Sequence, residues 1–155
     1  MSTPSTNLIT QLAAELAKHR PFSELPPALN ERLVAAARQV YYAPGETVLE
    51  PRQGVVESLH FIRSGSVGRE AGTSDAYSYE AGDLLPVGAW IGARAVTSRY
   101  VAHGDVFCLV LPGAAMREAA AAHPVLAEHL QRRGWAPLRE SRRALRAAPR
   151  SRPFS

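Results

Sequence analysis

From Gln39 to Gly113, glycines interrupt a succession of short segments, and this punctuation constrains the fold more than any other feature of the sequence. Ten glycines stand at positions 45, 54, 65, 68, 72, 82, 88, 92, 104 and 113. The segments between them are rich in valine, tyrosine, phenylalanine, leucine and threonine, which are residues that favour strands. Such a density of turn residues between short segments is typical of an antiparallel sandwich or barrel rather than of βαβ units.

We expect seven short strands in this region. They cover residues 40–43, 47–50, 58–63, 66–70, 76–79, 96–102 and 106–111. Residues 71–75 would form a hairpin tip, and the small residues after Asp83 would form a loop.

Apolar residues at three- and four-residue spacing predict helices on the N-terminal side of this region. The first helix carries Leu8, Ile9, Leu12 and Leu16 on one face, behind Ser5 and Thr6 as N-cap candidates, and ends before His19. The second helix follows Pro26-Pro27, since proline is favoured in the first turn of a helix. Between the two helices, a short turn would insert Phe22 and Leu25 into the core.

The helical period returns after Pro112. We expect one helix up to His123-Pro124, a second helix behind that break, and an arginine-rich third helix over residues 137–148. The expected organisation is a helix over residues 1–20, one domain over residues 21–133, and an arginine-rich tail over residues 134–155.

The net charge of +4 is unevenly distributed along the chain. Residues 130–155 hold eight arginines and one glutamate, whereas residues 1–129 hold 10 basic and 13 acidic residues. The tail could be solvated or disordered, could dock on an acidic partner, or could touch nucleic acid through its phosphates. Because the body is mildly acidic, we expect no specific nucleic-acid binding.

The single cysteine, Cys108, lies in the apolar run of residues 106–111, so it indicates a small buried hydrophobe rather than a nucleophile. No apolar run approaches the roughly 18 residues that a membrane-spanning helix needs, and the N-terminus lacks the pattern of a signal peptide. We therefore expect a cytoplasmic protein that does not enter a membrane.

Four motifs stand in an order that resembles the cyclic-nucleotide-binding domain family over residues 21–133. They are Pro21-Phe-Ser-Glu-Leu-Pro26, Tyr42-Ala-Pro-Gly-Glu46, Leu59-His-Phe-Ile-Arg-Ser-Gly-Ser-Val67 and Glu80-Ala-Gly-Asp-Leu84. The resemblance implies a mainly β fold with flanking α-helices: a double-stranded β-helix, or jelly-roll and cupin-like sandwich, with N- and C-terminal helices.

The family's phosphate-binding cassette reads approximately Phe-Gly-Glu, followed after about ten residues by Arg-x-Ala. In that cassette the glycine admits backbone N–H groups to the phosphate, the glutamate accepts from the ribose, and the arginine pairs with the phosphate. The resemblance places Pro86 and Val87 at the Gly-Glu positions and Val96 at the arginine position. No carboxylate occurs between Asp83 and Asp105, so the ribose acceptor is missing in any register.

Residues 86–91 and 94–102 look like a bacterial subgroup in which such a domain precedes CBS and nucleotidyltransferase domains. The resemblance is to the N-terminal sensory module of those multidomain proteins. Since the segment after Arg133 has no room for those domains or for a winged helix-turn-helix, we do not expect their activities here.

A cupin-like metal enzyme is a less favoured alternative. Its metal site would need a His-x-His pair, but the five histidines never stand two apart. Ile91 stands at the position where a cupin would place another histidine. The sequence also lacks the Gly-x-Ser-x-Gly motif of serine hydrolases. We therefore predict no metal site, no cofactor and no enzymatic activity. Trp90 and Tyr100 could stack on a base, although filling the core is the favoured interpretation.

The sequence therefore predicts a non-catalytic regulatory or sensory module with a degenerate cassette, which binds neither cAMP nor cGMP tightly. The alternative is a sensor in signal transduction that binds a nucleotide or another small anion in the same pocket. Its candidate ligand residues are Gly88, Arg94, Thr97, Ser98 and Arg99. A homodimer or a partner protein could pair with the C-terminal helices, in particular with the helix over residues 125–133.

Overall fold

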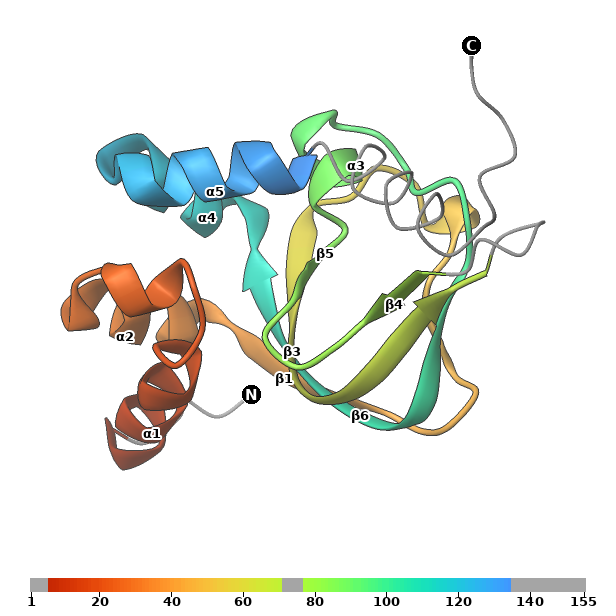
Figure 1. The fold of residues 1–155 in the computed structure, drawn as a ribbon, viewed down its shortest axis with the longest axis horizontal. Helices are drawn as coiled ribbons and strands as arrows, with labels where there is room; N and C mark the ends of the chain where they lie inside the picture. The colour runs from red at the N-terminus through yellow and green to blue at the C-terminus, as the bar shows by residue number, and fades with distance from the viewer. Residues whose placement is uncertain (1–5, 71–76, 135–155) are drawn as a thin grey trace, which may run out of the picture.

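The computed structural model describes residues 6–70 and 77–134, and Figure 1 shows their arrangement. The elements in chain order are α1 (Thr6–Leu16), η1 (Phe22–Glu24), α2 (Pro27–Ala36), β1 (Arg38–Tyr42), β2 (Thr47–Leu49), η2 (Pro51–Gln53), β3 (Ser58–Arg69), β4 (Tyr77–Tyr79), β5 (Leu84–Leu85), α3 (Val87–Ile91), β6 (Tyr100–Pro112), α4 (Gly113–Ala122) and α5 (Pro124–Gly134). An antiparallel sheet curls into a roll, and α1, α2, α4 and α5 lie together on one side of it (Figure 1). The predicted fold class, mainly β with flanking helices, is confirmed.

Two long strands form the centre of the sheet. β6 pairs antiparallel with β3 along most of its length, with Phe61 opposite Leu109 and Val67 opposite Ala102. β1 and β2 pair with the other edge of β6, whereas β4 and β5 pair with β3. The register of the β3–β6 pair shifts between Ile62 and Ser66, and such bulges increase the local twist that rolls a sheet up.

Two pairs of predicted strands are each one continuous strand, so those strand boundaries were wrong. Residues 58–63 and 66–69 both lie in β3, because Gly65 forms a bulge instead of a turn, and the predicted strand over 66–70 ends one residue earlier. Its φ of +97° suits glycine, and a Cβ there would lie 2.3 Å from the backbone oxygen of Asp105. Residues 100–102 and 106–111 likewise share β6, in which Gly104 adopts a φ of +90°.

The region between β5 and β6 also differs from the prediction. Residues 87–91, which were expected as part of a loop, form the short helix α3. Residues 96–99, which were expected at the start of a strand, precede β6 and have no strand partner. The expected hairpin tip at residues 71–75 lies outside the described residues.

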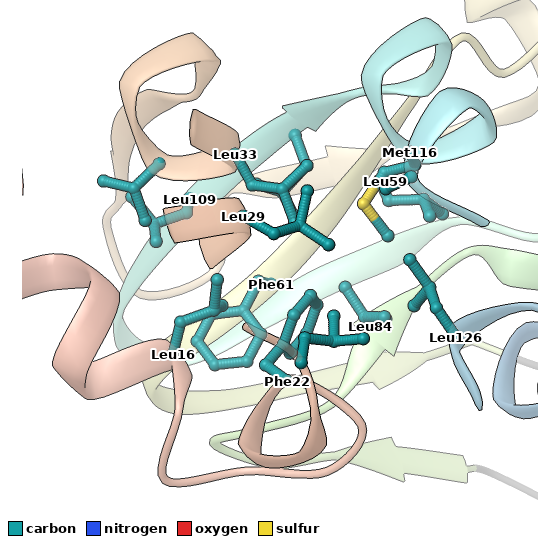
Figure 2. Close-up of a cluster of buried hydrophobic side chains, with 14 of the residues drawn as sticks. Leu16, Phe22, Leu29, Leu33, Leu59, Phe61, Leu84, Leu109, Met116 and Leu126 are labelled. Carbon is teal, nitrogen blue, oxygen red and sulfur yellow. The ribbon is translucent and has the colours of Figure 1, made fainter. Parts of the chain in front are cut away.

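Side chains alternate between two cores along the central strands. Leu59 and Phe61 of β3 face the helices, whereas Ile62 faces the inside of the roll. Figure 2 shows the core between helices and sheet, which we name the helix core. It joins buried side chains of α1, η1, α2, α4 and α5 to the sheet, including Leu16, Phe22, Leu33, Phe61, Leu109, Met116 and Leu126.

The second core fills the roll and is named the roll core. Its buried members are Val48, Leu49, Ile62, Val67, Tyr79, Leu85, Ala89, Val96, Tyr100, Ala102, Val106 and Cys108. Cys108 is 1% exposed, and burial raises the pKa of its thiol to about 12, as expected for a small packed hydrophobe.

The helices match the sequence closely. Phe22 and Leu25 are buried in the helix core, as predicted for the turn between the first two helices. Pro27 occupies the first turn of α2, and His123 ends α4 directly before α5 begins at Pro124. The division into residues 1–20, 21–133 and 134–155 stays a prediction, although α1 shares the helix core with the sheet. The arginine-rich helix expected over residues 137–148 lies outside the described residues.

In residues 6–70 and 77–134, no helix has the length and apolar character needed to cross a bilayer.

Candidate functional site

The turn before the cassette is held against β3 by backbone hydrogen bonds. Gly82 N–H donates to the Ile62 carbonyl at 2.8 Å, and Ile62 N–H donates to the Asp83 carbonyl at 3.1 Å. The Asp83 carboxylate also accepts from the Glu80 N–H at 2.8 Å. The turn therefore places β5 beside β3, with Leu84 opposite Phe61. Helix α3 begins two residues after β5 ends.

The two residues at the Gly-Glu positions are buried at the start of α3. Pro86 has no N–H to offer, and its carbonyl accepts from Trp90 N–H at 3.1 Å, which begins the helix. Val87 is 4% exposed and packs in the helix core. Position 87 therefore belongs to the interface between the sheet and the helices.

Val96 is buried in the roll core at 5% exposure. Its neighbours in that core include Leu49 and Tyr100, and the rings of Tyr100 and Tyr79 lie 5.8 Å apart between centroids. The position expected to carry a phosphate-binding arginine is thus occupied by an aliphatic side chain among other apolar side chains.

The five candidate ligand residues lie in two surroundings. Gly88 is partly buried within α3. Arg94 is exposed beside α3: its N–H donates to the Ala89 carbonyl at 3.0 Å, and its carbonyl accepts from Val56 N–H at 3.1 Å. Its guanidinium has no hydrogen-bond or ion-pair partner among the described residues.

Arg99 directly precedes β6, and its side chain is held by Thr47 of β2 and by Glu70, the residue after β3. Its Nε donates to Thr47 Oγ1 at 2.8 Å, and its Nη1 lies 3.2 Å from Glu70 Oε2. Thr97 is exposed and Ser98 is partly buried. In the part of the chain that the structure describes, no side-chain hydrogen bond joins either hydroxyl to Arg94 or Arg99. Anion binding by these five residues stays a prediction.

A buried histidine beside the cassette was not among the candidates. His60 lies within β3 at 7% exposure, and its Nε2 is 3.0 Å from the Tyr42 hydroxyl. Burial, helped by the charge of Arg38, lowers the pKa of His60 to about 4. The strand alternation that makes Leu59 and Phe61 face the helices could have identified His60 as a residue facing the roll.

His60 and Val96 line a cavity of about 140 Å³ beneath η2 and the segment that follows it. No group of three or more His, Cys, Asp or Glu residues in the described ranges is placed to hold a metal ion. The aromatic residues pack internally: Tyr100 fills the roll core, and Trp90 fills the helix core with the Arg117 guanidinium 5.2 Å from its ring centroid.

A larger hollow of about 560 Å³ lies between α1 and the outer face of β3 and β6. Arg63 and Glu15 both line it, and Arg63 donates two hydrogen bonds to Glu15, from Nε to Oε1 at 2.8 Å and from Nη2 to Oε2 at 3.0 Å. The hydrogen bond from Arg63 holds the pKa of Glu15 below its usual value. This bridge ties the first helix to the sheet.

No protein-family model matches the sequence, and no curated protein matches it in sequence. Solved structures match its fold. The regulatory domain of PKA from Toxoplasma gondii, solved with cAMP, has a TM-score of 0.69 at 14% identity, over 82% of this chain and 50% of that chain. A protein from Geobacter metallireducens described as cyclic-nucleotide-binding has a TM-score of 0.63 at 18% identity, over 80% of this chain and 92% of that one.

A cAMP-binding acyltransferase from Mycobacterium smegmatis has a TM-score of 0.65 at 22% identity, over 82% of this chain and 40% of that chain. This chain therefore spans half or less of two of these three relatives. The chain has the cyclic-nucleotide-binding fold, as its motifs predicted.

Proposed function

We propose that this chain is a non-catalytic regulatory or sensory module, built on the cyclic-nucleotide-binding fold, whose cassette does not bind cAMP or cGMP tightly. The observation that carries the proposal is the burial of Val96 in the roll core. Valine offers neither a charge nor a hydrogen bond to a phosphate.

The missing interactions are large enough to matter. A hydrogen bond to a charged group contributes about 1.5–3 kcal/mol, so the absent arginine alone weakens binding by about one to two orders of magnitude. Val87 adds a second loss, because it packs in the helix core where the resemblance implies a carboxylate for the ribose.

The space beside Val96 is also small. Ligand pockets usually measure about 300–1,000 Å³. The cavity that Val96 borders measures about 140 Å³, and Tyr79 and Tyr100 pack in the adjoining roll core. A nucleotide would have to displace these side chains.

Isothermal titration calorimetry with cAMP and cGMP tests this function. We expect no saturable heat at micromolar ligand, while the PKA regulatory domain, titrated in the same buffer, gives the positive control. Micromolar binding of either nucleotide would overturn the proposal.

The second candidate function is a sensor of another nucleotide or small anion. The guanidinium of Arg94 favours it, because it has no partner within residues 6–70 and 77–134. A thermal-shift screen of nucleotides and phosphorylated metabolites should then give a hit that Arg94→Ala abolishes. Arg52→Ala is the matched control, because Arg52 is also exposed but lies in η2. If no compound stabilises the protein, this candidate fails.

Pairing through the C-terminal helices stays a prediction. Leu126 and Leu130 of α5 are buried in the helix core and are not available to a partner. Among the described residues of α5, Val125 is the large apolar residue that is exposed, at 38%. Sedimentation equilibrium of the purified protein and of Val125→Glu would show whether a dimer forms and whether it uses this face.

A further inference from the structure

The cavity beneath η2 has two walls of different origin. Its inner wall is formed by buried residues that are far apart in the sequence, Leu49, His60 and Val96. Its outer wall is the segment over residues 50–58, in which Gln53 and Val55 are exposed to solvent. The cavity therefore lies directly behind a surface segment and reaches into the roll.

The size of the cavity limits what can occupy it. Its volume is about 140 Å³. An apolar cavity of about 150 Å³ in a protein core is known to hold benzene, whereas a cavity for one water needs far less space. A single five- or six-membered ring is therefore the largest rigid group that this cavity accommodates.

His60 gives the inner wall one polar feature. Because burial keeps the imidazole uncharged at neutral pH, one ring nitrogen donates a hydrogen bond and the other accepts one. Nε2 is occupied by the Tyr42 hydroxyl at 3.0 Å, while Nδ1 is buried without a partner among the described residues. A buried polar atom without a partner costs about 1–3 kcal/mol, so a hydrogen bond to this atom would be favourable.

The acidic residues that line the cavity act against anions. The lining includes the carboxylates of Glu50 and Glu57 and contains no lysine or arginine. Glu50 forms an exposed ion pair with Arg52 at 3.2 Å. Glu57 is the second acidic residue of the lining. An uncharged ligand avoids both the repulsion and the loss of hydration that an anion would suffer.

We propose that this cavity is a binding site for a small uncharged ring compound with one polar group, which lies against Val96 and hydrogen-bonds to His60. A phenol fits this description, because its hydroxyl can serve either tautomer of the imidazole. The inference goes beyond the proposed function, although both concern the cavity beside Val96. Phenol binding and cyclic-nucleotide binding are measured with different ligands, and each can fail while the other holds.

Titration of the ¹⁵N-labelled protein with phenol, followed by amide chemical shifts, tests the proposal. We expect saturable shifts at Leu49, Val56, His60 and Val96. Val96→Phe fills the cavity and should abolish these shifts. His60→Phe keeps the ring but removes both nitrogens, so it should weaken phenol about five-fold, the equivalent of a hydrogen bond of about 1 kcal/mol, and leave benzene within two-fold.

Any one of three results in solution would overturn the site. They are the absence of saturable shifts with phenol, unchanged phenol binding in Val96→Phe, and benzoate binding as tightly as phenol. If Val96→Phe does not fold, Val56→Phe fills the same space from the outer wall and takes its place. A crystal grown with phenol that shows only ordered water in the cavity would also refute the proposal.

Discussion

Acidification from pH 7 to pH 4 should destabilise the folded protein through the side chain of His60. Burial, with a contribution from Arg38, lowers the pKa of His60 to about 4, against 6.5 for an unperturbed histidine. Between these values the unfolded chain binds a proton that the folded chain does not. The free energy of unfolding therefore rises with pH across this window.

The sign and the size of this effect follow from the two pKa values. The stabilisation is fully present above about pH 6.5 and is lost as the pH falls towards about 4. Each unit of pKa difference corresponds to about 1.4 kcal/mol, so His60 should account for a loss of about 3 kcal/mol. The whole stability of a domain of this size is of order 5–15 kcal/mol, so the loss is readily measured.

Urea unfolding at pH 7, 6, 5 and 4.5, followed by tryptophan fluorescence, measures this contribution. We expect the wild-type curve to fall more steeply than that of His60→Phe, which keeps an aromatic ring at the site but cannot be protonated. His103→Gln is the control and should follow the wild type, because His103 is exposed. Parallel pH profiles for wild type and His60→Phe would refute the assignment of the effect to His60.

Two further predictions concern packing and an ion pair. Gly113→Ala should lower the free energy of unfolding by about 2 kcal/mol in a denaturant titration, because the added Cβ would lie 2.4 Å from Trp90 Nε1. The control is Ala114→Ser at the exposed neighbouring position, which should change the free energy of unfolding by no more than about 0.5 kcal/mol. Equal effects of the two substitutions would contradict the steric argument. Glu15→Gln should cost about 1 kcal/mol or less at pH 7, since Glu15 is 40% exposed. Because the pKa of Glu15 is lowered in the folded state, this stabilisation is present above pH 4.5 and is lost at lower pH. Equal stabilities of the wild type and the variant at pH 7 would refute the contribution of the ion pair.

The elements that were predictable from the sequence are those with local signals. Proline placed the start of α2 and the break between α4 and α5, and apolar spacing placed α1. Strand-favouring residues between glycines indicated the strands. The errors arose where one local signal has two outcomes. Gly65 can form a hairpin turn or a bulge, and the long-range pairing of β3 with β6 decides for the bulge.

The candidate site was less predictable because its contacts join distant parts of the chain. Arg99 looked available for an anion, yet its guanidinium contacts Thr47 of β2 and Glu70, which follows β3. The burial of Val96 and the His60–Tyr42 contact likewise depend on how the sheet rolls up. The sequence therefore shows which ligand-binding side chains are missing from the cassette, but it does not show which residues the candidate side chains contact.

β3 and β6 contribute to both cores at once, since successive side chains of the same strands enter the helix core and the roll core. Both cores depend on the same backbone ladder between β3 and β6. We therefore expect the two cores to unfold as one cooperative unit. We expect a substitution inside the roll to lower the stability of the helical layer as well, even though the two sets of side chains lie on opposite faces of the sheet.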